Sequence, residues 1–114
     1  MVLVRGVHSV LVTPFAPDES VDETSIGTLV DYCVAAGVDG VLVLGVLGEA
    51  YRLSDTERER MIAVTLERAA GRVQVTVGVT HQSTRVAVER ALAGERAGAA
   101  AVMASPPAGA SPSR

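Results

Sequence analysis

GVLVLGVLGEAYRLSDTERERM, residues 40–61, is the stretch that decides the fold of this 114-residue chain. It opens with a continuous apolar run, residues 40–45, which is typical of a parallel β-strand covered on both faces. Ser54 and Glu57 have the spacing of a capping box, in which a serine hydroxyl and a glutamate carboxylate close the first turn of a helix. Apolar residues then recur at helical spacing over residues 61–69. The stretch therefore predicts a strand, a short glycine-bracketed turn and a helix.

The rest of the chain repeats this alternation of strands and helices. Pro14 ends the first apolar strand because it has no N–H for a ladder. Asp22 can cap the next helix, and Gly37 suits the left-handed residue that closes it. We expect strands over residues 7–13, 40–45, 72–79 and 99–104, and helices over residues 23–36, 55–70 and 83–97. This βαβαβαβ order predicts a parallel sheet with right-handed crossovers.

The composition narrows the function. Hydrophobic residues make up 48% of the chain, and the formal net charge is −3 without a long run of one sign. That pattern argues against nucleic acid or an anionic membrane as a partner. No apolar run approaches the ~20 residues of a transmembrane helix, and the N-terminus lacks a signal-peptide pattern, so we expect a cytoplasmic protein. All 10 positively charged side chains are arginines, so this chain alone supplies no lysine amine to any mechanism.

Two regions differ in composition. We expect one α/β domain over residues 1–104 and a tail over residues 105–114. The tail is rich in proline, serine, alanine and glycine and has no apolar period, which predicts a linker or a disordered end. Cys33, the only cysteine, lies on the apolar side of an expected helix and is interpreted as a small buried hydrophobe.

The candidate sites lie where ligands collect in parallel α/β sheets, at the carboxyl ends of the strands. Residues 13–15, 45–49 and 78–82 follow the first three expected strands. The turn over residues 45–49 is the most promising, because glycine allows unusual dihedral angles and close approach of a ligand, and successive amides can form an anion nest. On spacing alone, a plain corner between a strand and a helix explains this turn equally well.

Other polar residues have simpler interpretations. Glu49 is read either as an acid that supports the site or as a surface residue. His8 and His81 have no partner at metal-ligand spacing, so we expect no metal site. One helix carries many charges, which predict a solvated face with local ion pairs; they are Arg52, Glu57, Arg58, Glu59, Arg60 and Glu67.

Five segments in order carry a resemblance to a known family. They are TPF at 13–15, VD at 21–22, GVDGVLVLGVLGEAYRLSDTERERM at 37–61, GRVQVTVGV at 71–79 and SPP at 105–107. Together they resemble the dihydrodipicolinate synthase / N-acetylneuraminate lyase family of class I aldolases. The family fold is a (β/α)₈ TIM barrel, commonly of ~250 residues. The resemblance therefore implies that this chain holds the N-terminal half of such a barrel, about four strands and three helices.

The resemblance also implies a chemistry. In the family, a lysine on the sixth strand forms a Schiff base with pyruvate or another small 2-oxo acid, a tyrosine on the fifth strand relays protons, and no cofactor is needed. The turn after the second strand holds the substrate carboxylate through backbone amides. Carried over by position, the substrate-binding residues are Gly45, Val46, Leu47 and Gly48, with Glu49 and Thr13 supporting the turn.

This sequence departs from the family pattern at several positions. Val46 and Leu47 stand where the best-known members have two threonines, so the amides remain but the hydroxyl of the proton relay does not. Ala108 and Gly109 stand where paired tyrosines often follow the proline. These departures favour a divergent lyase or aldolase branch over a dihydrodipicolinate synthase.

The expected function follows from what the chain lacks. Without the lysine and the fifth-strand tyrosine, we expect no catalytic residue in this chain, which reads as a truncated or split lyase that is inactive alone. The alternatives are a non-catalytic half barrel that binds a carboxylate or a partner, and a pseudogene product. Open sheet edges predict that the chain self-associates, pairs with a complementing C-terminal half, or folds poorly.

Overall fold

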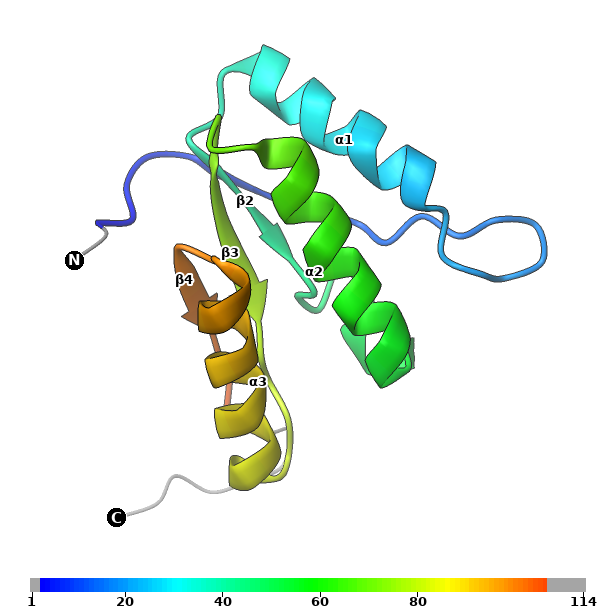
Figure 1. Cartoon of the computed structure of the whole chain (residues 1–114), viewed down its shortest axis with the longest axis vertical. Helices are drawn as coiled ribbons and strands as arrows, with labels where there is room; N and C mark the ends of the chain where they lie inside the picture. Colours follow the sequence, from blue (N-terminus) through cyan, green and yellow to red (C-terminus); the bar gives the residue numbers. More distant parts are fainter. Residues whose placement is uncertain (1–2, 107–114) are drawn as a thin grey trace.

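A computed structural model describes residues 3–106 as one α/β unit in which strands and helices alternate (Figure 1). The order is the predicted one. Its elements are β1 (His8–Val10), α1 (Glu23–Ala36), β2 (Gly40–Val43), the short 3₁₀ helix η1 (Ala50–Arg52), α2 (Asp55–Ala69), β3 (Gln74–Gly78), α3 (Thr84–Ala97) and β4 (Ala101–Met103). The expected tail lies largely outside the described residues, and its interpretation stays a prediction.

The four strands form one parallel sheet in the order β1-β2-β3-β4. The first strand is shorter than the expected range of residues 7–13. Leu11 still donates its amide to the Leu42 carbonyl at 2.9 Å, but the chain then leaves the sheet to form an antiparallel bridge between Phe15 and Val21. A parallel sheet in this order, with a helix after each of its first three strands, is the start of a barrel.

The core lies between the sheet and the helices. Val41, Val43 and Val77 are each 0% exposed and project from the sheet toward the helices. Cys33 is buried among them, as expected of a small hydrophobe. Figure 1 shows the three helices packed along one side of the strands. Burial of this apolar layer is the main source of stability in the described part of the chain.

The helix ends follow the sequence signals. The hydroxyl of Ser54 accepts from the Glu57 amide at 3.1 Å, and the Glu57 carboxylate accepts from the Ser54 amide at 2.9 Å, so the predicted capping box is confirmed. Asp22 caps α1, and Gly37 closes it in the left-handed conformation with φ 86°. These caps satisfy backbone groups that the helices leave free.

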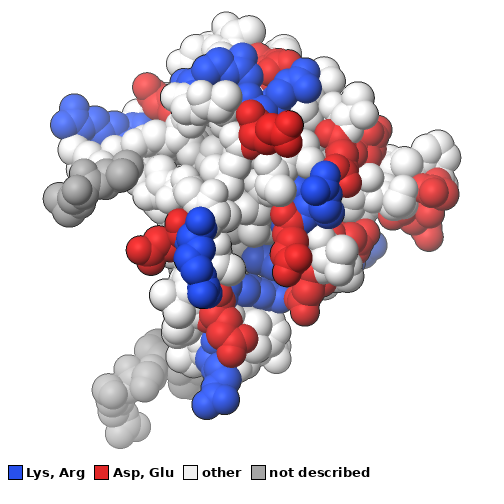
Figure 2. Space-filling view, in the orientation of Figure 1, with Lys and Arg blue, Asp and Glu red and all other residues white. Residues whose placement is uncertain are grey.

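Ion pairs join α1 to α2 and to Arg72, just after the end of α2, on the outer surface. Arg60 binds Glu23 at 2.6 Å, while Arg68 and Arg72 bind Asp31 at 2.6 and 2.8 Å. The hydrogen bonds from Arg68 and Arg72 lower the pKa of Asp31 to about 2. Figure 2 shows acidic and basic side chains interleaved over this face, without a block of one sign.

Within residues 3–106, no helix covers the opposite face of the sheet (Figure 1). Strand alternation and the register of Val10 with Leu42 and of Gly78 with Met103 place these side chains away from the helices. Val10 and Met103 are 42% and 40% exposed. In a closed barrel this face would be the packed interior.

Candidate functional site

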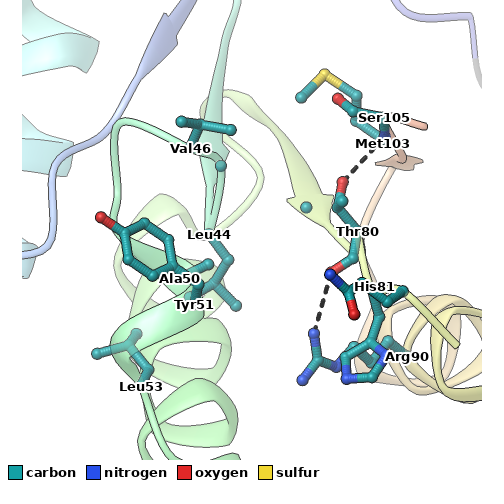
Figure 3. Close-up of a pocket in the computed structure, with 13 residues that line it drawn as sticks. Leu44, Val46, Ala50, Tyr51, Leu53, Thr80, His81, Arg90, Met103 and Ser105 are labelled. Atoms are coloured by element: carbon teal, nitrogen blue, oxygen red, sulfur yellow. Dashed lines mark hydrogen bonds between the residues drawn. The ribbon is translucent and has the colours of Figure 1, made fainter. Parts of the chain in front are cut away.

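The candidate site lies at the carboxyl ends of β2, β3 and β4. An open cavity of about 450 Å³ lies there, between the turn after β2 and the loop after β3. Figure 3 shows its two walls facing each other. One wall carries Leu44, Val46 and Tyr51, and the other carries Thr80, His81, Arg90, Met103 and Ser105.

Two left-handed residues shape the turn after β2. Leu44 has φ 64° and Glu49 has φ 53°, although neither is glycine. Gly45 and Gly48, which the sequence suggested as the source of unusual dihedral angles, are not among the residues with positive φ. A non-glycine residue in this region costs on the order of 1–3 kcal/mol. Such strain concentrates at functional sites, because the surrounding structure must hold it in place.

The glycines instead allow close packing of the backbone. A Cβ built on Gly48 would lie 3.1 Å from the Leu11 carbonyl oxygen and 3.5 Å from the Thr13 Oγ1. The buried Thr13 donates its hydroxyl to the Gly48 carbonyl at 2.5 Å. Thr13 therefore anchors the turn to the end of the first strand segment. It lies at the carboxyl end of the sheet, where the sequence predicted it.

The turn leaves several amides free. Within it, the Glu49 amide donates to the Val46 carbonyl at 2.9 Å, and the Ala50 amide reaches the Gly45 carbonyl at 3.5 Å. The amides of Val46, Leu47 and Gly48 donate to no acceptor among residues 3–106. Three successive free N–H groups at the end of a parallel strand are a site where an anion can bind.

The side chains of the turn do not add polar groups to it. Val46 and Leu47 are 78% and 59% exposed. Glu49 faces solvent, where its carboxylate lies 3.5 Å from Arg52. This placement fits the surface interpretation of Glu49 that the sequence left open; a supporting role for it stays a prediction.

Arg58 is buried, and its assignment to a solvated helix face is wrong. Its residue is 5% exposed, and its Nη2 donates to the Gly78 carbonyl at 3.0 Å. Burial, reinforced by the nearby cation Arg90 and opposed by Asp55, lowers the pKa of Arg58 to about 10, so the group stays charged at neutral pH. The spacing does hold a signal, because Arg58 precedes the buried Met61 and Thr65 by three and seven residues, the period of one helix face.

Gly78 links Arg58 to the turn. A Cβ built on Gly78 would overlap the Leu44 carbonyl oxygen and would lie 3.2 Å from the Gly45 nitrogen. The peptide between Leu44 and Gly45 thus rests directly on the Gly78 backbone. No sequence signal beyond the glycine itself indicates this contact.

The other wall is polar. The His81 Nδ1 accepts from the Ser83 amide at 2.9 Å, which assigns the proton of the neutral ring to Nε2. Arg90 donates to the Thr80 carbonyl at 3.2 Å, and the Thr80 hydroxyl accepts from the Ser105 amide at 2.9 Å (Figure 3). His81 lies in the loop at this end of the sheet, as the sequence predicted.

Residues 3–106 contain no group of three or more histidine, cysteine, aspartate or glutamate side chains placed to hold a metal. None of their helices, of which α2 with 15 residues is the longest, could span a bilayer.

A parallel sheet of sequential strands with helices on one face is the arrangement found in (β/α)-barrel proteins. The particular family follows from comparison with known proteins. The profile of the dihydrodipicolinate synthetase family matches residues 3–112, and the chain belongs to that family.

Individual relatives agree. A 4-hydroxy-tetrahydrodipicolinate synthase of Thermomicrobium roseum is 45% identical over 101 residues, which are 89% of this chain and 33% of that protein. An L-2-keto-3-deoxyarabonate dehydratase of Azospirillum brasilense is 40% identical over 103 residues, which are 90% of this chain and 33% of that protein. YagE, a prophage protein of the dihydrodipicolinic acid synthase family from E. coli K12, was solved in complex with pyruvate. It superposes with a TM-score of 0.82 at 28% identity, over 87% of this chain and 33% of that one.

The chain therefore spans about a third of the length of these relatives. Its four strands and three helices match the N-terminal part of the barrel in solved members of the family. The expected family and fold class are confirmed.

Proposed function

We propose that the turn of residues 45–49 holds the carboxylate of a small 2-oxo acid such as pyruvate. The observation that carries this proposal is the set of free amides at Val46, Leu47 and Gly48. A carboxylate accepts several hydrogen bonds at once, and charge-assisted bonds of this kind are the stronger ones. The pyruvate complex of YagE supports the ligand class.

The parent chemistry that we propose is that of a lyase or aldolase. The substrate would be held by this turn while a lysine elsewhere in the barrel forms the Schiff base. This chain has no lysine, and a Schiff base needs a primary amine. We therefore assign binding, without turnover, to the chain by itself, and no catalytic role to any of its residues.

The reaction branch concerns two kinds of enzyme, synthases and dehydratases. Both kinds of enzyme are among the relatives. Val46 and Leu47 offer amides and apolar walls without hydroxyls, so the turn acts as a holding site and not as a proton relay. The best-known members of the family have two threonines at these positions, and their absence here favours a branch other than dihydrodipicolinate synthase.

A matched pair of variants tests the holding site. Leu47→Ala removes the side chain and keeps the amide, whereas Leu47→Pro also removes the N–H. Titration of the ¹⁵N-labelled chain with pyruvate, followed by NMR, should show millimolar binding in the wild type and in Leu47→Ala, and much weaker binding in Leu47→Pro. Equal affinity of the two variants, with both folded, would contradict the proposal.

The uncovered sheet face supports a second proposal, that this chain self-associates or pairs with a C-terminal half. Val10 and Met103 expose apolar surface where a barrel would be packed, and such surface is usually covered in soluble proteins. Light scattering across protein concentrations should show a mass above 11.7 kDa. A monomer at every concentration, with no binding of a hydrophobic dye, would refute this.

A further inference from the structure

We propose that Arg58 is a positioning residue for the carboxylate site, and that its buried charge is a counter-charge for the bound anion. This inference rests on the proposed function of the turn of residues 45–49. Arg58 does not line the cavity between the two walls. It acts through Gly78 and the peptide that joins Leu44 to Gly45.

The first step is geometric. Arg58 extends from the first turns of α2 and donates to the Gly78 carbonyl at 3.0 Å. The Gly78 backbone in turn supports the Leu44–Gly45 peptide, with no room for even one methyl group between them. Leu44 is the left-handed residue from which the turn starts. Arg58 thereby fixes the surface on which the strained start of the turn rests.

The second step is electrostatic. A buried charge is costly unless it is paired. Among residues 3–106, Arg58 forms no ion pair with a carboxylate, and Asp55, the acid that influences it, has a side chain 93% exposed. Asp55, Glu59 and Glu89 line a surface cavity beside Arg58, but none of them forms an ion pair with its guanidinium. The positive charge of Arg58 would attract an anion held by the Val46–Gly48 amides. This attraction acts through protein, which screens it less than water would.

The two steps together explain why an arginine occupies this position on a helix. An apolar residue could fill the space beside Met61, but it could neither hold the Gly78 carbonyl nor supply charge. Lysine could supply charge from one point, without the planar fork of arginine. The two substitutions therefore separate charge from positioning.

The experiment uses the full chain and three variants. Arg58→Met removes the charge and the hydrogen bond, and Arg58→Lys keeps the charge. Arg60→Met, on the exposed neighbouring face of α2, is the matched control for loss of an arginine. Backbone chemical shifts of Leu44, which reflect its left-handed conformation, are measured without ligand. Affinities are then measured by NMR for pyruvate and for pyruvamide, its uncharged amide.

Without ligand, Arg58→Met should shift the Leu44 signals and Arg60→Met should not. Arg58→Met should weaken the binding of pyruvate roughly tenfold more than the binding of pyruvamide. A difference of about tenfold in affinity is a reasonable size for one charge–charge interaction inside a protein. Arg58→Lys, which keeps the charge, should recover most of the affinity for pyruvate that Arg58→Met loses relative to pyruvamide. A merely structural role would weaken both ligands equally, and that result overturns the counter-charge.

The remaining outcomes test the positioning role and the counter-charge separately. Unchanged Leu44 signals in a folded Arg58→Met overturn the positioning role, whether or not pyruvate binds. If the wild type binds neither compound, the proposed function fails and the counter-charge fails with it. In that case the Leu44 signals still decide the positioning role.

Discussion

Replacing Gly78 by alanine tests how closely β2 and β3 meet beneath the turn. The new Cβ would overlap the Leu44 carbonyl oxygen and would lie 2.7 Å from the Leu44 carbonyl carbon, against about 3.5–4.0 Å for an ordinary contact between carbon atoms. The atoms in the way are backbone, which cannot rotate aside. The two strand ends must separate, and Leu44 loses the support for its left-handed conformation.

The expected cost is at the upper end for overpacking, about 3 kcal/mol. With an m-value of about 1.5 kcal/mol/M, the urea midpoint should fall by roughly 2 M. The assay is urea unfolding followed by circular dichroism at one fixed protein concentration, so that any self-association is the same in each sample.

Gly94→Ala is the control, because it adds the same methyl group within α3. There the Cβ would lie 3.3 Å from Val102 Cγ1, a side-chain atom that can adjust, and alanine favours a helix over glycine by about 1 kcal/mol. Gly94→Ala should stay within about 1 kcal/mol of the wild type. A Gly78→Ala chain as stable as this control would refute the close packing of the two strands.

Three more outcomes are expected. The Thr65 hydroxyl is buried without a hydrogen-bond partner among the described residues, so Thr65→Val should raise the free energy of unfolding by about 1 kcal/mol in urea titrations; a loss of stability would contradict this. Because Asp31 has a lowered pKa of about 2, its ion pairs stabilise the fold above pH 4 and lose this effect as the pH falls toward 2. The difference in thermal midpoint between wild type and Asp31→Asn should therefore shrink over that range, and a constant difference would argue against the pairs. Borohydride with pyruvate should give no side-chain adduct by mass spectrometry of peptides, since the chain has no lysine; any label should lie on the α-amine, and a labelled internal peptide would contradict the assignment of binding without turnover.

Local signals in the sequence predicted most of the fold. The caps at Asp22 and Ser54, the closing glycine Gly37 and the alternating valines of β3 all act through near neighbours in the chain. Such features depend on a few residues and on steric rules, so one sequence is enough to find them. The first strand was predicted too long because its last residues leave the sheet for a bridge that local pattern does not indicate.

The geometry of the site was harder to predict from the sequence. The turn was found, but its left-handed residues are Leu44 and Glu49 and not the glycines, because the strain is imposed by contacts with β3 and the first strand segment. Arg58 was assigned to the surface because arginine is mostly exposed, whereas its burial depends on Gly78, 20 residues away. Contacts between distant segments decide both features. Helical spacing places Arg58 on the same face of α2 as Met61 and Thr65, but it does not indicate the carbonyl that Arg58 binds.

A crystal structure of this chain with pyruvate tests the central claim most directly. The account predicts that the carboxylate lies against the turn of residues 45–49, with its oxygens at about 2.7–3.2 Å from at least two of the amide nitrogens of Val46, Leu47 and Gly48. Pyruvate bound instead on the opposite wall, beside His81 and Arg90 with the turn amides unoccupied, would contradict it.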